Sequence, residues 1–133
     1  MLVAAIRIPT GASGVLVDSV VAGDLKPLVS VPLVLEYESV LTRPEHLSVS
    51  GFTADEAVNI VKAFCRMGES VHLPFLLRPQ LPDPDDEFVL ETAFHGRADV
   101  IVTFNSKDFH AAARGFGIEV VSPRDAVRRL RER

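Results

Sequence analysis

The chain has 133 residues, 47% of them hydrophobic, and a formal net charge of −4. This length predicts one domain spanning residues 1–133, and the hydrophobic content argues against a disordered chain. The negative charge argues against non-specific binding to a large nucleic-acid surface, but not against a nuclease, because acids that hold a divalent cation add to that charge. No apolar run reaches membrane-spanning length, and residues 1–8 lack the charged start of a signal peptide. Cys65 is the one cysteine and has no disulfide partner. A cytoplasmic protein is therefore expected.

Short apolar strands alternate with helices along the sequence. Residues 1–8 are either a buried strand or the end of a helix, since the apolar pattern fits both. Glycine, proline and capping signals predict helices over 15–22, 32–42, 57–67 and 83–96, and a last helix after Ser122-Pro123. Strands are expected at 28–31, 71–73, 100–103 and 118–121, an extended segment at 75–82, and a loop or one helical turn at 105–109. This alternation predicts a three-layer α/β/α fold, with a parallel sheet sandwiched by helices.

Four acidic residues open the helix that is expected to begin near position 83: Asp83, Asp85, Asp86 and Glu87. An N-cap at Asp83 and one acid in the first turn would complement the helix dipole, so capping explains about two of the four. Four carboxylates within five residues repel one another, and a divalent cation would relieve that repulsion. Capping remains the favoured explanation of this cluster taken alone, and a metal site is the alternative that accounts for all four acids.

Other oxygen donors lie in two separate parts of the chain. Glu36 is at the edge of the apolar face of its helix, a position that is more often simply solvated. Asn105 and Asp108 follow the expected strand 100–103, where Asn105 is equally able to cap a short turn. In a parallel sheet, strand carboxyl ends and the following helices border one crevice, where these groups and Asp85 or Asp86 could gather. Oxygen-only ligands of this kind suit Mg²⁺ or Mn²⁺.

Four segments taken together carry a family resemblance: residues 33–41 (LVLEYESVL), 83–86 (DPDD), 101–109 (IVTFNSKDF) and 121–124 (VSPR). In this order and spacing they resemble PIN-domain proteins of the type that forms the toxin component of bacterial toxin–antitoxin systems. The resemblance implies Mg²⁺- or Mn²⁺-dependent hydrolysis of RNA phosphodiester bonds, an antitoxin partner and a homodimer. The catalytic acids that it implies are Glu36, Asp86 and Asp108, with Asp85 and Asn105 as additional metal ligands.

The chain departs from the family pattern at its start. The family begins with a strand that ends in an Asp-Thr-Asn-type motif, and Met1 stands directly after the place of that motif. The first strand and its metal-binding aspartate are therefore expected to be missing, either because the gene product starts upstream or because the chain is a truncated, inactive relative. Loss of the first strand would leave a gap in the sheet. We expect residues 2–8 to enter the sheet in its place, a partner chain to supply a strand, or the fold to be marginally stable.

Several basic residues are candidates for positioning the RNA backbone, namely Lys107, Arg97 and Arg114, although solvated surface charge explains them equally well. The arginine-rich C-terminal helix is more readily a solvated face than an RNA contact. Two other functions stay open. One is a catalytically impaired PIN-fold module that binds an antitoxin-like partner, which the missing aspartate favours. The other is a phosphoacceptor receiver domain, which is disfavoured because no expected strand ends in an isolated aspartate.

Overall fold

The computed structural model describes residues 2–7, 14–103 and 106–132. Its strands are β1 (Leu2–Ile6), β2 (Leu25–Val29), β3 (Glu69–Ser70), β4 (Val100–Val102) and β5 (Glu119–Val121). Its helices are α1 (Gly14–Val21), α2 (Val31–Leu41), α3 (Pro44–Ser50), α4 (Ala54–Met67), α5 (Pro84–Gly96), α6 (Ser106–Gly115) and α7 (Pro123–Arg131). No helix in the described ranges is long and apolar enough to cross a membrane.

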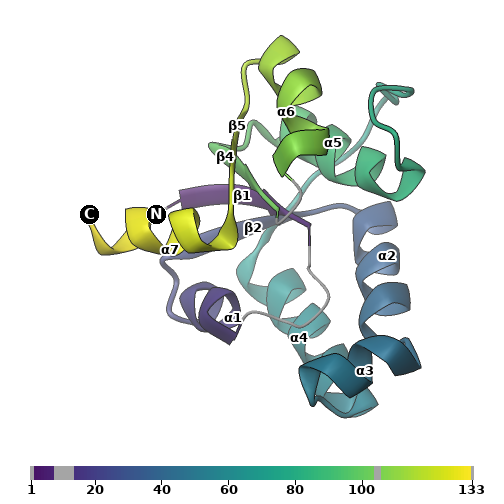
Figure 1. The fold of residues 1–133 in the computed structure, drawn as a ribbon, viewed down its shortest axis with the longest axis vertical. Helices are drawn as coiled ribbons and strands as arrows, with labels where there is room; N and C mark the ends of the chain where they lie inside the picture. The colour runs from purple at the N-terminus through teal and green to yellow at the C-terminus, as the bar shows by residue number, and fades with distance from the viewer. Residues whose placement is uncertain (1, 8–13, 104–105, 133) are drawn as a thin grey trace.

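The five strands form one parallel sheet in the order β3-β2-β1-β4-β5. Helices α1, α4 and α7 lie on one side of this sheet, and α5 and α6 lie on the other (Figure 1). Helix α2 packs against both α4 and α5, and so closes one end of the molecule. The predicted three-layer α/β/α fold is confirmed.

The apolar stretch at the start of the chain forms the middle strand of the sheet. β1 pairs with β2 on one side and with β4 on the other, so that Ala4 lies opposite both Pro27 and Val100. All of its residues except Val3 are buried. A strand covered on both faces needs a continuous apolar run and not an alternating one, which is what residues 2–6 provide. Of the three arrangements expected for residues 2–8, the structure has residues 2–6 in the sheet.

Local signals set several helix ends as predicted. Thr53 Oγ1 accepts the amide of Glu56 at 3.1 Å, and Glu56 Oε1 accepts the amide of Thr53 at 3.2 Å, which completes a capping box before α4. Ser122 Oγ accepts the amide of Asp125 at 3.1 Å and so caps α7. Helix α5, predicted over 83–96, spans Pro84–Gly96. These ends depend on residues close in sequence, which is why they can be read from it.

Other predicted elements are wrong in type or place. Residues 106–109, expected as a loop or one turn, belong to the longer helix α6, because Phe109 and Ala113 are buried one turn apart. The strand expected at 71–73 lies instead at 69–70, as β3. The strand expected at 28–31 begins earlier: β2 spans Leu25–Val29 and includes Pro27. Helix α3 is unexpected: Pro44 predicts the end of the preceding helix, yet it also opens the next one.

Tyr37 ties α2 to the end of the middle strand. Its hydroxyl donates a hydrogen bond to the carbonyl of Ile6, and its ring packs edge-to-face on Phe64 with 5.9 Å between centroids. Burial raises the pKa of Tyr37 far above its usual value, so that the hydroxyl remains protonated and continues to donate at neutral and mildly alkaline pH. This contact holds α2, and with it Glu36, against the carboxyl end of β1.

The substitution Tyr37→Phe is expected to lower the free energy of unfolding by about 1–3 kcal/mol. It keeps the ring packing but leaves the buried Ile6 carbonyl without this donor. Urea denaturation followed by circular dichroism measures the change. Thr42→Ala, which removes an exposed hydroxyl bond to the Glu38 carbonyl, is the control and should change stability by about 0.5 kcal/mol or less. Equal midpoints for Tyr37→Phe and the unaltered chain would contradict the prediction.

Candidate functional site

The strand order creates a switch point at the carboxyl ends of β1 and β4. From β1 the chain moves outward through β2 and β3, then returns to build β4 and β5 on the other side of β1. In open parallel sheets, ligands bind in the crevice outside the strand ends at such a point. Arg7 directly follows β1 there, and the buried residue Thr103 directly follows β4.

Asp86 brings a buried carboxylate to this crevice. It lies in the first turn of α5 and is only 4% exposed. Its Oδ1 atom accepts a hydrogen bond from Nε of Arg7 at 2.6 Å, which places it beside the end of β1. The positive end of the helix dipole further favours a carboxylate at this position. The predicted catalytic acid is thus at the switch point.

Glu36 approaches the same edge of the sheet from α2. This helix begins just after the carboxyl end of β2 and packs against α5. Glu36 is half-buried and its Oε1 atom is buried, so it is not the freely solvated residue that its edge position favoured. At the end of β2, the hydroxyls of Ser30 and Thr92 are 2.8 Å apart, which ties this strand end to α5.

The remaining predicted ligands are only partly described. Asp85 lies on α5 and Asp108 on α6, but their side chains, and the whole of Asn105, lie outside the described residues. Within the described part of the chain, no group of three or more His, Cys, Asp or Glu side chains is placed to hold a metal. Glu36 and Asp86 are donors of the type that Mg²⁺ and Mn²⁺ prefer, so the chemistry of the donors fits, although these two alone fall short of a full ligand set.

Two other acids of α5 have a structural role. Glu87 is 3% exposed, and its Oε1 atom accepts the amides of Gln80 at 2.8 Å and Leu81 at 2.6 Å. One turn later, Glu91 is 1% exposed and its Oε2 atom accepts the amide of Leu77 at 2.8 Å. The role of Glu87 is thus to accept backbone amides, so one more acid of the cluster 83–87 is explained without a metal. Together, Glu87 and Glu91 hold the segment 77–81 against α5.

Two of the predicted RNA-binding residues lie on α6. Lys107 is exposed at the start of this helix, which directly follows β4 and so begins at the crevice edge of the sheet. Arg114 is exposed in the last turn, where its Nη2 atom lies 3.3 Å from Nε2 of His110. Ten residues of helix separate the two ends by about 15 Å, so Lys107 is the better placed of the two for substrate bound near Asp86.

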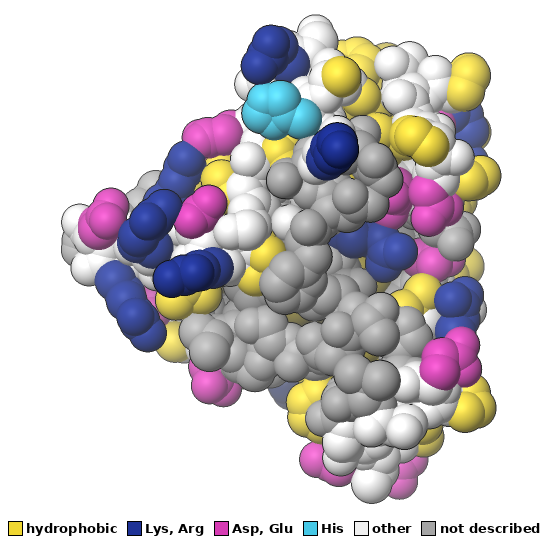
Figure 2. Space-filling model, viewed as in Figure 1, with side chains coloured by type: hydrophobic (Ala, Val, Ile, Leu, Met, Phe, Trp, Pro, Cys, Tyr) yellow, Lys and Arg dark blue, Asp and Glu magenta, His cyan; other side chains and the backbone are white. Residues whose placement is uncertain are grey.

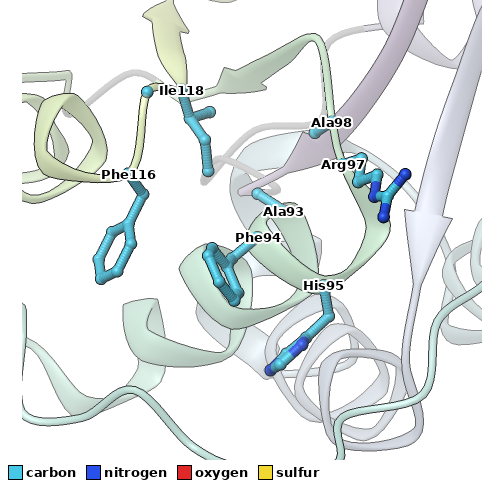
Figure 3. A pocket seen from close by; sticks show the side chains of 8 residues that line it. Ala93, Phe94, His95, Arg97, Ala98, Phe116 and Ile118 are labelled. Carbon is cyan, nitrogen blue, oxygen red and sulfur yellow. The ribbon is translucent and has the colours of Figure 1, made fainter.

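Arg97, the third predicted RNA-binding residue, lies at the opposite edge of the sheet. It connects the end of α5 to the start of β4, whereas the crevice borders the other end of β4. There it lines an open cavity of about 490 Å³ together with aromatic side chains that include Phe94, His95 and Phe116 (Figure 3). The rings of Phe94 and Phe116 pack edge-to-face, 5.3 Å apart. An RNA contact at Arg97 would therefore be remote from Asp86.

Basic side chains also gather over α7 (Figure 2). Arg128 pairs with Asp125 at 2.8 Å, and Arg129 pairs with Glu119. The hydrogen bond from the Arg129 guanidinium holds the pKa of Glu119 below its usual range. Part of the charge of α7 is therefore neutralised within the chain, as expected of a solvated helix face.

Arg7 was not predicted as a site residue. It is the one charged residue in the apolar stretch 1–8, near its carboxyl end, and that position is the signal that could have identified it. Its partner Asp86 is 79 positions away, and no local pattern connects the two.

A parallel sheet with a buried carboxylate at its switch point defines an α/β protein with an acidic site at the strand ends. A family model for the PIN domain matches residues 1–107 of the chain. The chain belongs to the PIN-domain family, whose function is generally that of a nuclease and generally depends on divalent metal ions. The receiver-domain alternative is thereby set aside. Neither the curated proteins nor the solved structures include a match to the chain.

Proposed function

We propose that this protein is a Mg²⁺- or Mn²⁺-dependent ribonuclease of the PIN type that acts in the cytoplasm as the toxin of a toxin–antitoxin pair. The observation that carries the nuclease assignment is the buried carboxylate of Asp86 at the switch point of the sheet. Glu36, on a helix that packs against α5, supports it as a second acid at the same edge. The toxin role, the antitoxin partner and a homodimer rest on the sequence resemblance alone.

The groups of the chain have separate roles in this proposal. The residues that would hold the cation are oxygen donors, and they are Glu36, Asp85, Asp86, Asn105 and Asp108. When bound, the cation supplies a Lewis acid that activates water and stabilises negative charge developing on the phosphate. The N-terminus of α5 lies beside Asp86 and favours an anionic phosphate there. Lys107, at the start of α6, is placed to contact the RNA backbone.

Cleavage of a fluorescently labelled single-stranded RNA by the purified chain tests this function. Activity is expected to require added Mg²⁺ or Mn²⁺ and to disappear in EDTA. Glu36→Gln should lower the cleavage rate by about tenfold or more, because it removes an anionic ligand. Glu38→Gln is the matched control: Glu38 lies on the same helix but is exposed, and the rate should not change. RNA cleavage that persists in EDTA and in Glu36→Gln would refute the proposed chemistry.

A second candidate is a catalytically impaired PIN-fold module that binds an antitoxin-like partner and cuts no RNA. The ion pair between Arg7 and Asp86 favours it, because a side-chain cation already occupies one oxygen of the main acid. A folded chain that binds no Mn²⁺ at millimolar concentration and cleaves no RNA would support this module over the nuclease.

A further inference from the structure

The ion pair between Arg7 and Asp86 lies where a cation of the proposed site would bind. Nε of Arg7 is 2.6 Å from Oδ1 of Asp86, and the Asp86 side chain is 5% exposed. A carboxylate withdrawn so far from water needs a positive partner, because an unpaired buried charge is strongly disfavoured. Arg7 provides a positive partner for it, through the hydrogen bond from its Nε atom to Oδ1.

A divalent cation at Asp86 would compete with the positive charge that Arg7 places on Oδ1. A guanidinium stays charged in proteins, and a Mg²⁺ or Mn²⁺ ion coordinated at about 2.1 Å from the oxygen would face it at close range. The repulsion between two cations this near is large in a partly buried site. The Arg7 side chain is 29% exposed, and its long stem gives the guanidinium a route toward solvent.

We propose that Arg7 is the resident counter-cation of Asp86 and that it sets the affinity of the acidic site for divalent cations. Binding of Mg²⁺ or Mn²⁺ at Asp86 then competes with the Arg7 ion pair, and the cation binds more tightly when the charge of Arg7 is removed. This inference rests on the proposed function, because it needs a divalent cation at Asp86. Arg7 is then a positioning residue, because it controls access of the divalent cation to Asp86, and it is not a catalytic residue.

Mn²⁺ titration by calorimetry on the full 133-residue chain tests this role without any measurement of activity. Arg7→Gln is expected to bind Mn²⁺ on the order of tenfold more tightly than the unaltered chain, because the competing charge is gone. Arg7→Met removes the same charge but keeps the apolar stem, and should act in the same direction. Arg7→Lys keeps the charge and should bind nearly as weakly as the unaltered chain. Arg124→Gln, the same charge change at an exposed position on α7, is the matched control and should leave the affinity unchanged.

The outcomes separate this inference from the proposed function. Measurable but equal Mn²⁺ affinities in Arg7→Gln and the unaltered chain would overturn the role of Arg7 and leave the proposed function standing. An Arg7→Lys affinity as high as that of Arg7→Gln would also overturn it, since charge would then not be the cause. Absence of Mn²⁺ binding in both proteins would overturn the inference and the metal-dependent function together. Thermal melting shows whether each variant is folded. If Arg7→Gln does not fold, Arg7→Met provides the same comparison with a neutral side chain.

Discussion

Asp86→Asn is expected to reduce RNA cleavage on the order of 100-fold or more, while the chain still folds. The substitution keeps the shape of the side chain but replaces an anionic oxygen pair with a neutral amide. A neutral amide neither balances the charge of a divalent cation nor holds it as tightly. The effect should exceed that of Glu36→Gln, because Asp86 is the more deeply buried of the two acids.

The same substitution should also weaken the fold, since Arg7 loses its anionic partner. We expect a loss of about 1–3 kcal/mol in the free energy of unfolding, reduced from the value for a fully buried pair because Arg7 is partly exposed. Urea denaturation measures this loss and shows whether the variant is folded in the cleavage assay. Asp55→Asn, an exposed acid in the first turn of α4, is the control for both measurements. Cleavage by folded Asp86→Asn at the original rate would show that Asp86 is not a ligand.

Glu91→Ala is expected to lower the free energy of unfolding by about 2–4 kcal/mol, with no direct contact to the proposed metal site. Glu91 Oε1 is 2.8 Å from Nη2 of Arg78, and the bond from Arg78 holds the guanidinium pKa above its usual range. The opposite oxygen accepts the amide of Leu77. Truncation therefore removes the partner of a charge and of a backbone donor at once. Because 31% of the Arg78 side chain is exposed, solvent reduces the cost below that of a fully buried pair.

Urea denaturation at neutral pH measures this effect, and limited thermolysin digestion locates it. Cleavage should become faster within residues 75–82, because the segment loses its anchor on α5. Glu91→Gln should cost less, since the amide keeps an acceptor for Leu77. Glu38→Ala, at an exposed helical position, is the matched control. An unchanged unfolding midpoint in Glu91→Ala would mean that the anchor contributes no net stability.

Helix ends and strand alternation could be predicted because they depend on neighbours in sequence. The Thr53 capping box is an example, since both of its hydrogen bonds join residues three apart. The length of α6 could not be predicted from turn signals alone. What extends this helix is the burial of Phe109 and Ala113 against the sheet, and that depends on the tertiary fold. Where local preferences are weak, tertiary burial therefore determines how far a helix extends.

The candidate site shows the same division. Asp86 and Glu36 could be proposed because acids at helix starts and helix edges are visible in sequence, and the structure places both at the crevice edge. Their environment could not be predicted. The Arg7 partner of Asp86 comes from a distant strand, and the structural role of Glu87 depends on backbone amides of a segment without regular structure.

The outer strands of the sheet limit how copies of this chain can associate. β3 has two residues and β5 has three, and each begins with an exposed glutamate, Glu69 or Glu119. An open strand edge is a template for aggregation, but a very short edge that carries charge is a poor one. A homodimer of this protein would therefore be built from helix surfaces and not from a sheet continued between subunits.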